Sequence, residues 1–190
     1  MDISHLFKSK TRKELFRLYF TNPDQAYYLR ELERMLHIPV SMVRKELTRL
    51  EAEGIFLSQK KANSIYYLLN QSYPLYEELK SIVFKTIGIQ GLLRESLGKM
   101  KGIELAFIYG SFAKREESAQ SDIDLLVVGT PDDAGLTREI GKLEKKLKRE
   151  INYTLFKKAE FKQKIKEKNP FVTDLLNNPK IFLIGDPHDL

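Results

Sequence analysis

The chain of 190 residues contains no cysteine and only three histidines. Without cysteine, neither a disulfide nor a thiolate zinc site nor thiol redox chemistry can exist, and three scattered histidines disfavour a histidine-rich metal site. Residues 1–4 lack a basic segment followed by an apolar one, and no apolar run approaches the length needed to cross a bilayer. We therefore predict a cytoplasmic protein without a membrane partner.

Composition and charge limit the kind of protein without identifying it. Hydrophobic residues make up 42% of the chain, which suffices for one large or two small cores, and no internal repeat is present. The formal net charge of +6 favours anionic partners. Residues 1–86 carry 14 Lys and Arg against 10 Asp and Glu, whereas the remainder carries 18 against 16. The basic excess therefore leans towards the N-terminal half.

Two apolar runs flank a polar segment in the C-terminal half. The first covers residues 105–109, and the second, residues 125–128, follows Asp122 and Asp124. Apolar runs of this length that are bounded by glycine predict buried strands, and residues 111–118 lack proline and glycine and can form a helix between them. Because side chains alternate along a strand, the two aspartates should share one face. The pattern predicts strand, turn, helix and strand, with two carboxylates beside the turn.

This arrangement suits phosphate chemistry. Small residues at a strand end, here Gly110 and Ser111, allow backbone N–H groups to approach a phosphate at the positive end of a helix. A pair of carboxylates supplies the hard oxygen ligands that Mg²⁺ prefers. The alternative is a simple glycine turn followed by a solvated Ser-Asp-x-Asp loop, because short motifs of this kind are not specific by themselves.

The segment from Gly110-Ser111 to Ser121-Asp122-Ile123-Asp124 resembles the motif of the DNA polymerase beta type nucleotidyltransferase superfamily, particularly its minimal nucleotidyltransferase branch. The resemblance implies that the Gly-Ser pair holds a nucleoside triphosphate and that a third acid on a later strand completes the site. It assigns catalysis and metal binding to Asp122 and Asp124, and nucleotide binding to Gly110, Ser111, Lys114 and Ser121. The implied cofactors are Mg²⁺ or Mn²⁺ and a nucleoside triphosphate.

The third acid is not where the resemblance places it, on the strand predicted at residues 151–155. In active relatives an Asp near the start of this strand deprotonates the attacking hydroxyl, and the closest match here is Asn152, whose neutral amide cannot act as a base. Glu150 shares its face but lies about 6.6 Å away along the strand, so it could substitute only if the register or backbone adjusted. A second departure is Arg115, where many minimal nucleotidyltransferases have glycine. Beside Lys114 it could meet phosphates or simply be solvated.

The remaining C-terminal segments predict helices and a strand that cap the sheet. Residues 136–148 form an amphipathic pattern whose end carries three lysines and Arg149, where cations complement the helix dipole. Residues 157–168 and 170–176 predict two further helices, and residues 181–184 predict a last strand.

The N-terminal half begins with three predicted helices. Apolar residues recur at helical spacing in residues 10–20, 28–36 and 41–53, and turn signals separate these segments. Ser41 can cap the third helix, and Gly54 can end it. The third helix should bury its apolar side and expose a basic one.

A β-hairpin is predicted directly after these helices. Residues 55–58 and 65–69 have the composition of strands, and residues 59–64 form a polar tip between them. The order helix, helix, short turn, helix, glycine and hairpin resembles the winged helix-turn-helix domains of prokaryotic transcription regulators, in which the third helix enters the major groove. The resemblance rests on order and spacing rather than on any single residue.

This second resemblance places basic side chains where duplex DNA would be met. Three acids on the third helix, Glu46, Glu51 and Glu53, dilute the basic face. The alternative is a merely solvated helix face and a hairpin that serves dimerisation. The predicted DNA-binding residues are Ser41, Arg44, Lys45, Thr48 and Arg49 on the third helix and Lys60 and Lys61 at the hairpin tip.

The sequence thus predicts an α+β protein in three parts. Residues 1–72 form a winged helix-turn-helix DNA-binding domain, residues 73–100 a helical connection, and residues 101–190 an α/β nucleotidyltransferase-like domain with a mixed sheet. The favoured function is a transcription regulator, with a homodimer as the expected assembly, whose nucleotidyltransferase domain binds nucleotide and metal but is catalytically weakened. The alternative is an active Mg²⁺-dependent enzyme that moves a nucleotidyl group to a hydroxyl of a protein or small-molecule acceptor.

Overall fold

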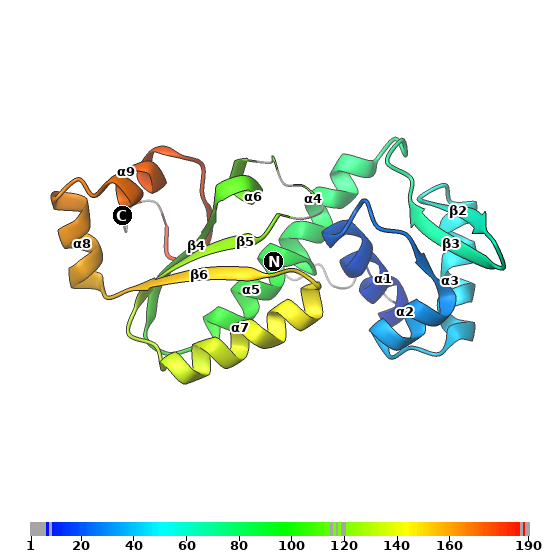
Figure 1. Ribbon diagram of the computed structural model, residues 1–190, viewed down its shortest axis with the longest axis horizontal. Coiled ribbons are helices and arrows are strands. Elements are labelled where there is room, and N and C mark those ends of the chain that lie inside the picture. Colours follow the sequence, from blue (N-terminus) through cyan, green and yellow to red (C-terminus); the bar gives the residue numbers. More distant parts are fainter. Residues whose placement is uncertain are drawn as a thin grey trace. The chain divides into compact units, whose positions relative to one another are not determined.

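The computed structural model describes residues 7, 9–114, 116, 118, 121–186 and 188. The prediction made on residues 1–4 and the departure noted at Arg115 lie outside the described residues. The chain divides into two units, residues 1–89 and 90–190, and each is described by itself (Figure 1). No helix within the described ranges is long and apolar enough to cross a bilayer.

Three helices open the N-terminal unit in the predicted order. The first, α1 (Lys10–Thr21), is capped by Ser9, whose hydroxyl oxygen accepts a hydrogen bond from a backbone N–H of the first turn at 3.3 Å. The second, α2 (Leu29–Leu36), ends at His37, which adopts a left-handed conformation with φ 53°. This residue turns the chain into α3 (Val40–Ala52).

The start of α3 differs from the prediction that Ser41 caps it. The helix begins at Val40 after Pro39, and Ser41 lies in the first turn with its side chain exposed. The Val40 N–H donates to the Glu33 carboxylate at 3.2 Å, so one of the unpaired N–H groups of the helix start is satisfied from α2 instead. Gly54 follows the helix end as predicted, with a φ of 78° that favours glycine.

The N-terminal unit also contains a three-stranded antiparallel sheet with strand order β1-β3-β2. Its strands are β1 (Tyr27–Tyr28), β2 (Phe56–Lys61) and β3 (Ser64–Leu69). The predicted tip over residues 59–64 is too long, because the turn consists of Ala62 and Asn63, and Lys60 and Lys61 lie on β2. The exposed polar residues of this edge strand have the composition of a loop. The prediction therefore ended the strand at residue 58, whereas β2 continues to Lys61.

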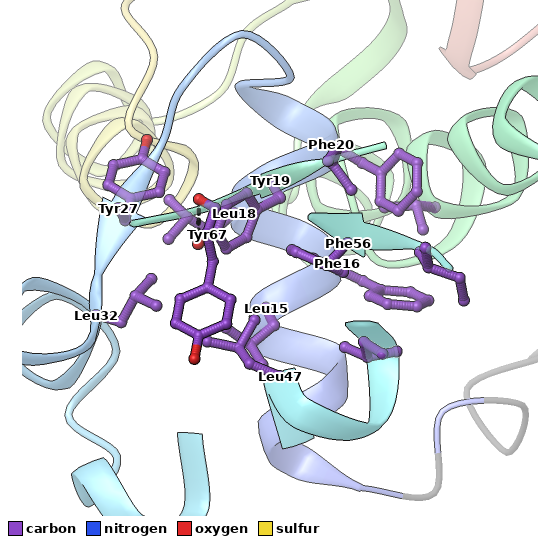
Figure 2. Close-up of a cluster of buried hydrophobic side chains, with 14 of the residues drawn as sticks. Leu15, Phe16, Leu18, Tyr19, Phe20, Tyr27, Leu32, Leu47, Phe56 and Tyr67 are labelled. Atoms are coloured by element: carbon purple, nitrogen blue, oxygen red, sulfur yellow. Dashed lines mark hydrogen bonds between the residues drawn. The ribbon is translucent and has the colours of Figure 1, made fainter. Parts of the chain in front are cut away.

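The helices and the sheet of the N-terminal unit share one hydrophobic core (Figure 2). Tyr19 is fully buried in it, and its ring makes edge-to-face contacts with Tyr27 at 5.2 Å and Phe56 at 4.7 Å between centroids. The Tyr19 hydroxyl donates to the Tyr67 carbonyl at 3.1 Å, so this buried polar atom is satisfied. A fourth helix, α4 (Tyr76–Thr86), packs on the same core.

The C-terminal unit is built on a four-stranded mixed sheet with strand order β6-β5-β4-β7. Its strands are β4 (Ile103–Tyr109), β5 (Ile123–Gly129), β6 (Ile151–Phe156) and β7 (Ile181–Ile184), and its helices are α5 (Ile89–Gly98), α6 (Gly110–Lys114), α7 (Asp133–Leu147), α8 (Lys158–Lys166) and α9 (Pro170–Asn177). Only β5 and β6, which α7 connects, are paired in parallel. The predicted strands and the α+β class are therefore confirmed.

Helices cover both faces of this sheet (Figure 1). On one face Phe107 and Leu126 pack with Val172 of α9 and with residues of α8. On the opposite face Ile123 and Leu125 are fully buried, and α5 and α7 lie on that side. The first face is apolar only where α8 and α9 cover it. Polar side chains occupy its other end, where β4 finishes and β5 begins.

The helices predicted as a connection over residues 73–100 are divided between the two units, which separate after residue 89. Tyr76 and Val83 of α4 are buried in the N-terminal core. Leu93 and Leu97 of α5 are fully buried in the C-terminal unit. Each helix is thus part of a core rather than of a linker, because its apolar face needs a partner to cover it.

Candidate functional site

Three neighbouring strands place Tyr109, Asp124 and Asn152 in one row across the sheet. Tyr109 ends β4 and pairs with Asp124 on β5, and Asp124 pairs in turn with Asn152 on β6. Paired residues of adjacent strands point to the same face, so these three side chains share the face that α8 and α9 cover at its other end. Asp122 lies two residues before Asp124, and the two carboxylates are therefore on the same side of the sheet, as the alternation predicts.

Gly110 makes room for the Asp124 carboxylate. It opens α6 directly after β4 with a φ of 70°, a conformation that favours glycine. A Cβ atom at this position would lie 2.3 Å from Asp124 Oδ2, far inside contact distance. The carboxylate thus fills the space that any larger residue at this position would need.

The Asp124 carboxyl is harder to ionise than an ordinary aspartate. Partial burial raises its pKa most, and the negative charge of Asp122 raises it further. In the part of the chain that the structure describes, no Lys or Arg forms an ion pair with either carboxylate. A cation between the two groups would relieve both effects, so this pair fits one divalent metal ion. Across the same described residues, no group of three or more His, Asp or Glu side chains is arranged to hold a metal.

Asn152 is the third side chain beside the carboxylates. Its Nδ2 donates a hydrogen bond to Asp122 Oδ2 at 3.2 Å. Glu150 precedes β6 and is exposed, and its backbone carbonyl accepts a hydrogen bond from the Ile123 N–H at 2.9 Å. That bond belongs to the parallel ladder and fixes the register, so Glu150 stays one two-residue repeat, about 6.6 Å, from Asn152.

Ser121 is held in place by Arg149, whose role the sequence does not reveal. Arg149 Nη1 donates to the backbone carbonyls of Ser118 at 2.8 Å and Ser121 at 2.9 Å, and its guanidinium lies 5.7 Å from the Phe112 ring centroid. Arg149 is 8% exposed, whereas the three lysines near it are exposed. It therefore braces the segment that leads to Asp122 instead of complementing the dipole of α7. No sequence signal distinguishes it from those lysines.

The other predicted nucleotide contacts lie on α6. Ser111 is half-buried, and its backbone carbonyl accepts a hydrogen bond from the Glu116 N–H at 2.9 Å. Lys114 ends the helix and is exposed. A helix of five residues sums few peptide dipoles, so the positive helix end predicted here is weak. The nucleotide-binding roles assigned to Gly110, Ser111, Lys114 and Ser121 stay predictions.

The outer face of α3 carries residues predicted to bind DNA. Together with Val40 they line a surface hollow of about 580 Å³. These lining residues are Ser41, Arg44, Lys45, Thr48 and Arg49, and all five are exposed. Lys60 and Lys61, the other predicted contacts, are exposed on β2, and the Lys61 ammonium lies 5.6 Å from the Tyr66 ring centroid.

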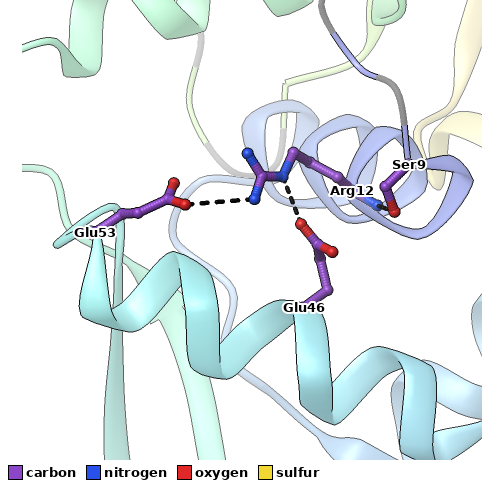
Figure 3. Close-up of polar contacts among 4 residues, drawn as sticks. All are labelled: Ser9, Arg12, Glu46 and Glu53. Atoms are coloured by element: carbon purple, nitrogen blue, oxygen red, sulfur yellow. Dashed lines mark hydrogen bonds and ion pairs between the residues drawn. The ribbon is translucent and has the colours of Figure 1, made fainter.

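The three acids predicted to dilute this basic face, Glu46, Glu51 and Glu53, each have a partner within the chain. Glu46 is buried and accepts a hydrogen bond from Arg12 Nε of α1 at 2.5 Å, and the same guanidinium reaches Glu53 at 3.4 Å (Figure 3). Glu51 accepts a hydrogen bond from the Ser58 hydroxyl at 2.5 Å. None of the three acids lines the hollow. The hollow on α3 is therefore lined by cations without an acid among them, whereas Glu53 at the end of the helix stays exposed.

Comparison with known proteins identifies the domain that contains the carboxylate pair. Residues 92–185 match the family model described as polymerase beta, nucleotidyltransferase, so the C-terminal unit carries a nucleotidyltransferase-type domain. A crystal structure described as a toxin–antitoxin with AMP-PNP is similar at 17% identity and a TM-score of 0.38, covering 53% of this chain and 76% of that chain. A mutant of the toxin–antitoxin MntA-HpeT is similar at 15% identity and a TM-score of 0.37, with the same coverage. No curated protein matches the chain.

Proposed function

We propose that the C-terminal unit binds a nucleoside triphosphate together with Mg²⁺ or Mn²⁺ and transfers its nucleotidyl group slowly or not at all. Asp122 and Asp124 would hold the cation, which would neutralise charge on the phosphates. Ser111 and Lys114 follow β4 at the edge of the same site and would contact the phosphates. The nucleotidyltransferase-type domain and the like-charged carboxylate pair support this assignment.

The hydrogen bond from Asn152 to Asp122 carries the proposal. Nucleotidyl transfer needs a group that takes the proton of the acceptor hydroxyl as that oxygen attacks. The side chain beside Asp122 is an amide, which can neither take up a proton nor add negative charge to the site. The site is therefore suited to binding a nucleotide and poorly suited to activating an acceptor.

We further propose that the N-terminal unit is a winged helix-turn-helix domain that binds duplex DNA. In this proposal α3 enters the major groove and the hairpin of β2 and β3 contacts the adjacent backbone. The paired acids support it, because Glu46 and Glu53 meet Arg12 and leave Arg44 and Arg49 to face the hollow. A hollow lined by cations and by no acid suits the binding of a polyanion.

Joined in one chain, the two units would form a cytoplasmic transcription regulator that responds to a nucleotide. A homodimer would present two α3 helices to the half-sites of a symmetric operator. The alternative, an active transferase with a protein or small-molecule acceptor, differs from this proposal in one observable quantity, the rate of turnover.

Binding and turnover measured on the same protein separate the two functions. Calorimetry with each of the common ribonucleoside triphosphates should show binding that requires Mg²⁺ and is lost in Asp122→Ala. Incubation with labelled nucleotide, Mg²⁺ and cell extract should transfer little label. Binding that survives Asp122→Ala contradicts the pocket, and brisk transfer that Glu150→Gln abolishes identifies an active enzyme with Glu150 as its third acid.

DNA binding is tested by the electrophoretic mobility of duplexes, among them the region upstream of the gene itself. Retardation should be strong at low salt and weaken as salt is added. The Lys and Arg side chains of the protein release counterions from the DNA phosphates, and added salt opposes this release. A wild-type protein that retards no duplex at low salt rules out the regulator.

A further inference from the structure

Phe171 is an exposed aromatic residue whose exposure the packing of the C-terminal unit does not explain. It is the second residue of α9 and is 41% exposed, whereas Val172 and Leu175 of the same helix are buried against the sheet. Asn169 caps the helix, and its side-chain oxygen accepts from the Phe171 N–H at 3.1 Å. The cap and the proline at the first helical position fix the backbone, so the ring is presented at the surface by a rigid element.

The Phe171 ring contacts Tyr109. Their centroids lie 6.0 Å apart and their planes meet at 78°, an edge-to-face arrangement. Tyr109 is half-buried, and the Thr154 side chain on β6 lies near enough to its hydroxyl to lower its pKa. The backbone of Tyr109 is held by the pairing of β4 with β5, so its ring gives Phe171 a support on one side.

Tyr109 also connects Phe171 to the carboxylates. It pairs with Asp124 across the antiparallel strands β4 and β5, a pairing in which Cα atoms lie about 4.5 to 5.5 Å apart. Burial raises the pKa of Tyr109 most, the Thr154 side chain lowers it, and the negative charge of Asp124 raises it, which reflects the same proximity. The uncovered ring of Phe171 is thus one side chain away from the group that would hold the metal and the phosphates.

Other exposed apolar side chains lack this setting. Met42 and Leu75 are each 53% exposed, but both belong to the N-terminal unit, whereas the carboxylate pair belongs to the C-terminal unit. Single exposed apolar residues are common on protein surfaces and need no explanation by themselves. What distinguishes Phe171 is that its ring contacts Tyr109, the strand partner of the proposed metal ligand Asp124.

We propose that Phe171 is the platform on which the base of the bound nucleoside triphosphate stacks. The inference rests on the proposed nucleotide binding and adds the place of the base. Every nucleobase has an aromatic face, and stacking on an aromatic side chain accepts all of them. The nucleotide is then held at two ends, the phosphates beside Asp122 and Asp124 and the base on Phe171, and the exposed ring is covered when the nucleotide is bound.

The chain contains no tryptophan, so Phe171→Trp places a single fluorescent reporter at the platform. Nucleoside triphosphate with Mg²⁺ should change the tryptophan emission because the base stacks on the indole. Inorganic tripolyphosphate with Mg²⁺ carries the phosphates without a base, so it should displace the nucleotide and restore the emission of the ligand-free protein.

Removal of the ring gives the quantitative test. Phe171→Ala should weaken nucleoside triphosphate binding by about 5-fold to 150-fold, the range for losing one stacked base, and leave the affinity for tripolyphosphate unchanged. Phe171→Tyr should retain the wild-type affinity for both. Leu75→Ala removes an apolar side chain of comparable exposure from the other unit and should change neither affinity.

The results distinguish failure of the platform from failure of the proposed function. If Phe171→Ala binds both probes as the wild type does while Asp124→Ala binds neither, nucleotide binding stands and the base lies elsewhere, which overturns the inference. If the wild type binds neither probe in the presence of Mg²⁺, the proposed nucleotide binding fails and the platform fails with it.

Discussion

Acidic side chains have opposite surroundings in the two units. In the N-terminal unit the buried Glu46 is paired with Arg12, so its charge is compensated within the fold. In the C-terminal unit Asp122 and Asp124 lie on the same side of one sheet, and their charges repel. The hydrogen-bonding neighbour there is the neutral amide of Asn152 rather than a cation.

This difference separates structural acids from acids that await a ligand. A carboxylate that gains a partner within the chain stabilises the folded state, whereas two carboxylates facing one another cost stability unless a cation joins them. Such arrangements cluster at functional sites, because there the partner comes from outside the chain.

The largest effect is expected from Asn152→Asp, which adds a third carboxylate to the site at nearly constant size. A positioned base typically contributes 10²-fold to 10⁴-fold to a rate, and the added charge should also tighten Mg²⁺ binding. Transfer of labelled nucleotide, measured with saturating Mg²⁺, should therefore rise by about 10²-fold to 10⁴-fold. Glu150→Gln serves as the control and should leave the rate unchanged. A variant that binds Mg²⁺ more tightly without gaining turnover would place the missing base elsewhere.

Removing Arg12, the cation that pairs with the buried Glu46, should have the next largest effect. Arg12→Ala leaves the buried Glu46 without its partner, which should lower the free energy of unfolding by about 2 to 3 kcal/mol, less than for a fully buried pair because Arg12 is partly exposed. Denaturant unfolding measures this. Lys99→Ala breaks an ion pair with both side chains exposed, to Glu95, and should cost less than about 1 kcal/mol.

A second substitution shows whether the charge of Glu46 is responsible. Arg12→Ala combined with Glu46→Gln removes the buried charge along with its partner, and much of the lost stability should return. If the double variant is no more stable than Arg12→Ala, packing of the arginine stem rather than charge compensation explains the loss.

The regular elements of both units could be predicted because their signals are local. Apolar runs bounded by glycine gave the strands on either side of Gly110, and helical spacing gave α1 to α3. Strand alternation also predicted that Asp122 and Asp124 share one face, whereas the register that pairs Asp124 with Asn152 is seen only in the folded sheet. The hairpin turn was predicted too long because an exposed edge strand and a loop have the same polar composition.

Contacts between distant side chains could not be predicted. The sequence assigned Glu46 to the outer face of α3. Its partner Arg12 lies 34 residues earlier in the chain, and the two meet because α1 packs against α3. Arg149 looked like its lysine neighbours until the fold placed the carbonyls of Ser118 and Ser121 around it. Tyr109 and Phe171 lie on separate elements, and a single sequence carries no signal for their contact. Tertiary packing decides these roles, whereas periodicity reports the local structure alone.

Replacing a cation on the outer face of α3 should have a smaller effect than breaking the Arg12–Glu46 pair. The effect should be on the affinity for DNA and not on the stability of the fold. Arg44→Ala or Arg49→Ala should cost about 1 to 3 kcal/mol of affinity for a preferred duplex, because each could contact a base edge in the major groove. Lys60→Ala and Lys61→Ala should instead weaken binding to all sequences and reduce the salt dependence. Fluorescence anisotropy over a salt series separates the two behaviours. Equal losses on every duplex for all four variants would assign α3 a purely electrostatic role.

The smallest effect is expected on the stability of the ligand-free chain when Asp124 is neutralised. Burial, and after it the charge of Asp122, raises the pKa of Asp124 above its usual value of 3.8. A carboxyl whose pKa is raised on folding contributes stability that is fully present below its unfolded pKa and is lost as the pH rises through its folded pKa. Near neutral pH the ionised group is therefore destabilising. Asp124→Asn should raise the free energy of unfolding there, by less than about 1 kcal/mol because the site is largely open to solvent.

Thermal unfolding of the wild type and Asp124→Asn, from about pH 3 to about pH 7 without divalent cations, checks this sign. The two melting temperatures should converge at the acidic end and separate towards neutrality, with the variant melting higher. Asp133→Asn is the matched control, because Asp133 lies in the first turn of α7, where a negative charge favours the helix, and its loss should lower the melting temperature near neutrality. Added Mg²⁺ should stabilise the wild type and close the gap at Asp124. A wild type that melts higher than Asp124→Asn near neutrality without divalent cations would mean that this carboxylate already has a partner within the chain, and the contrast between the two units would not hold.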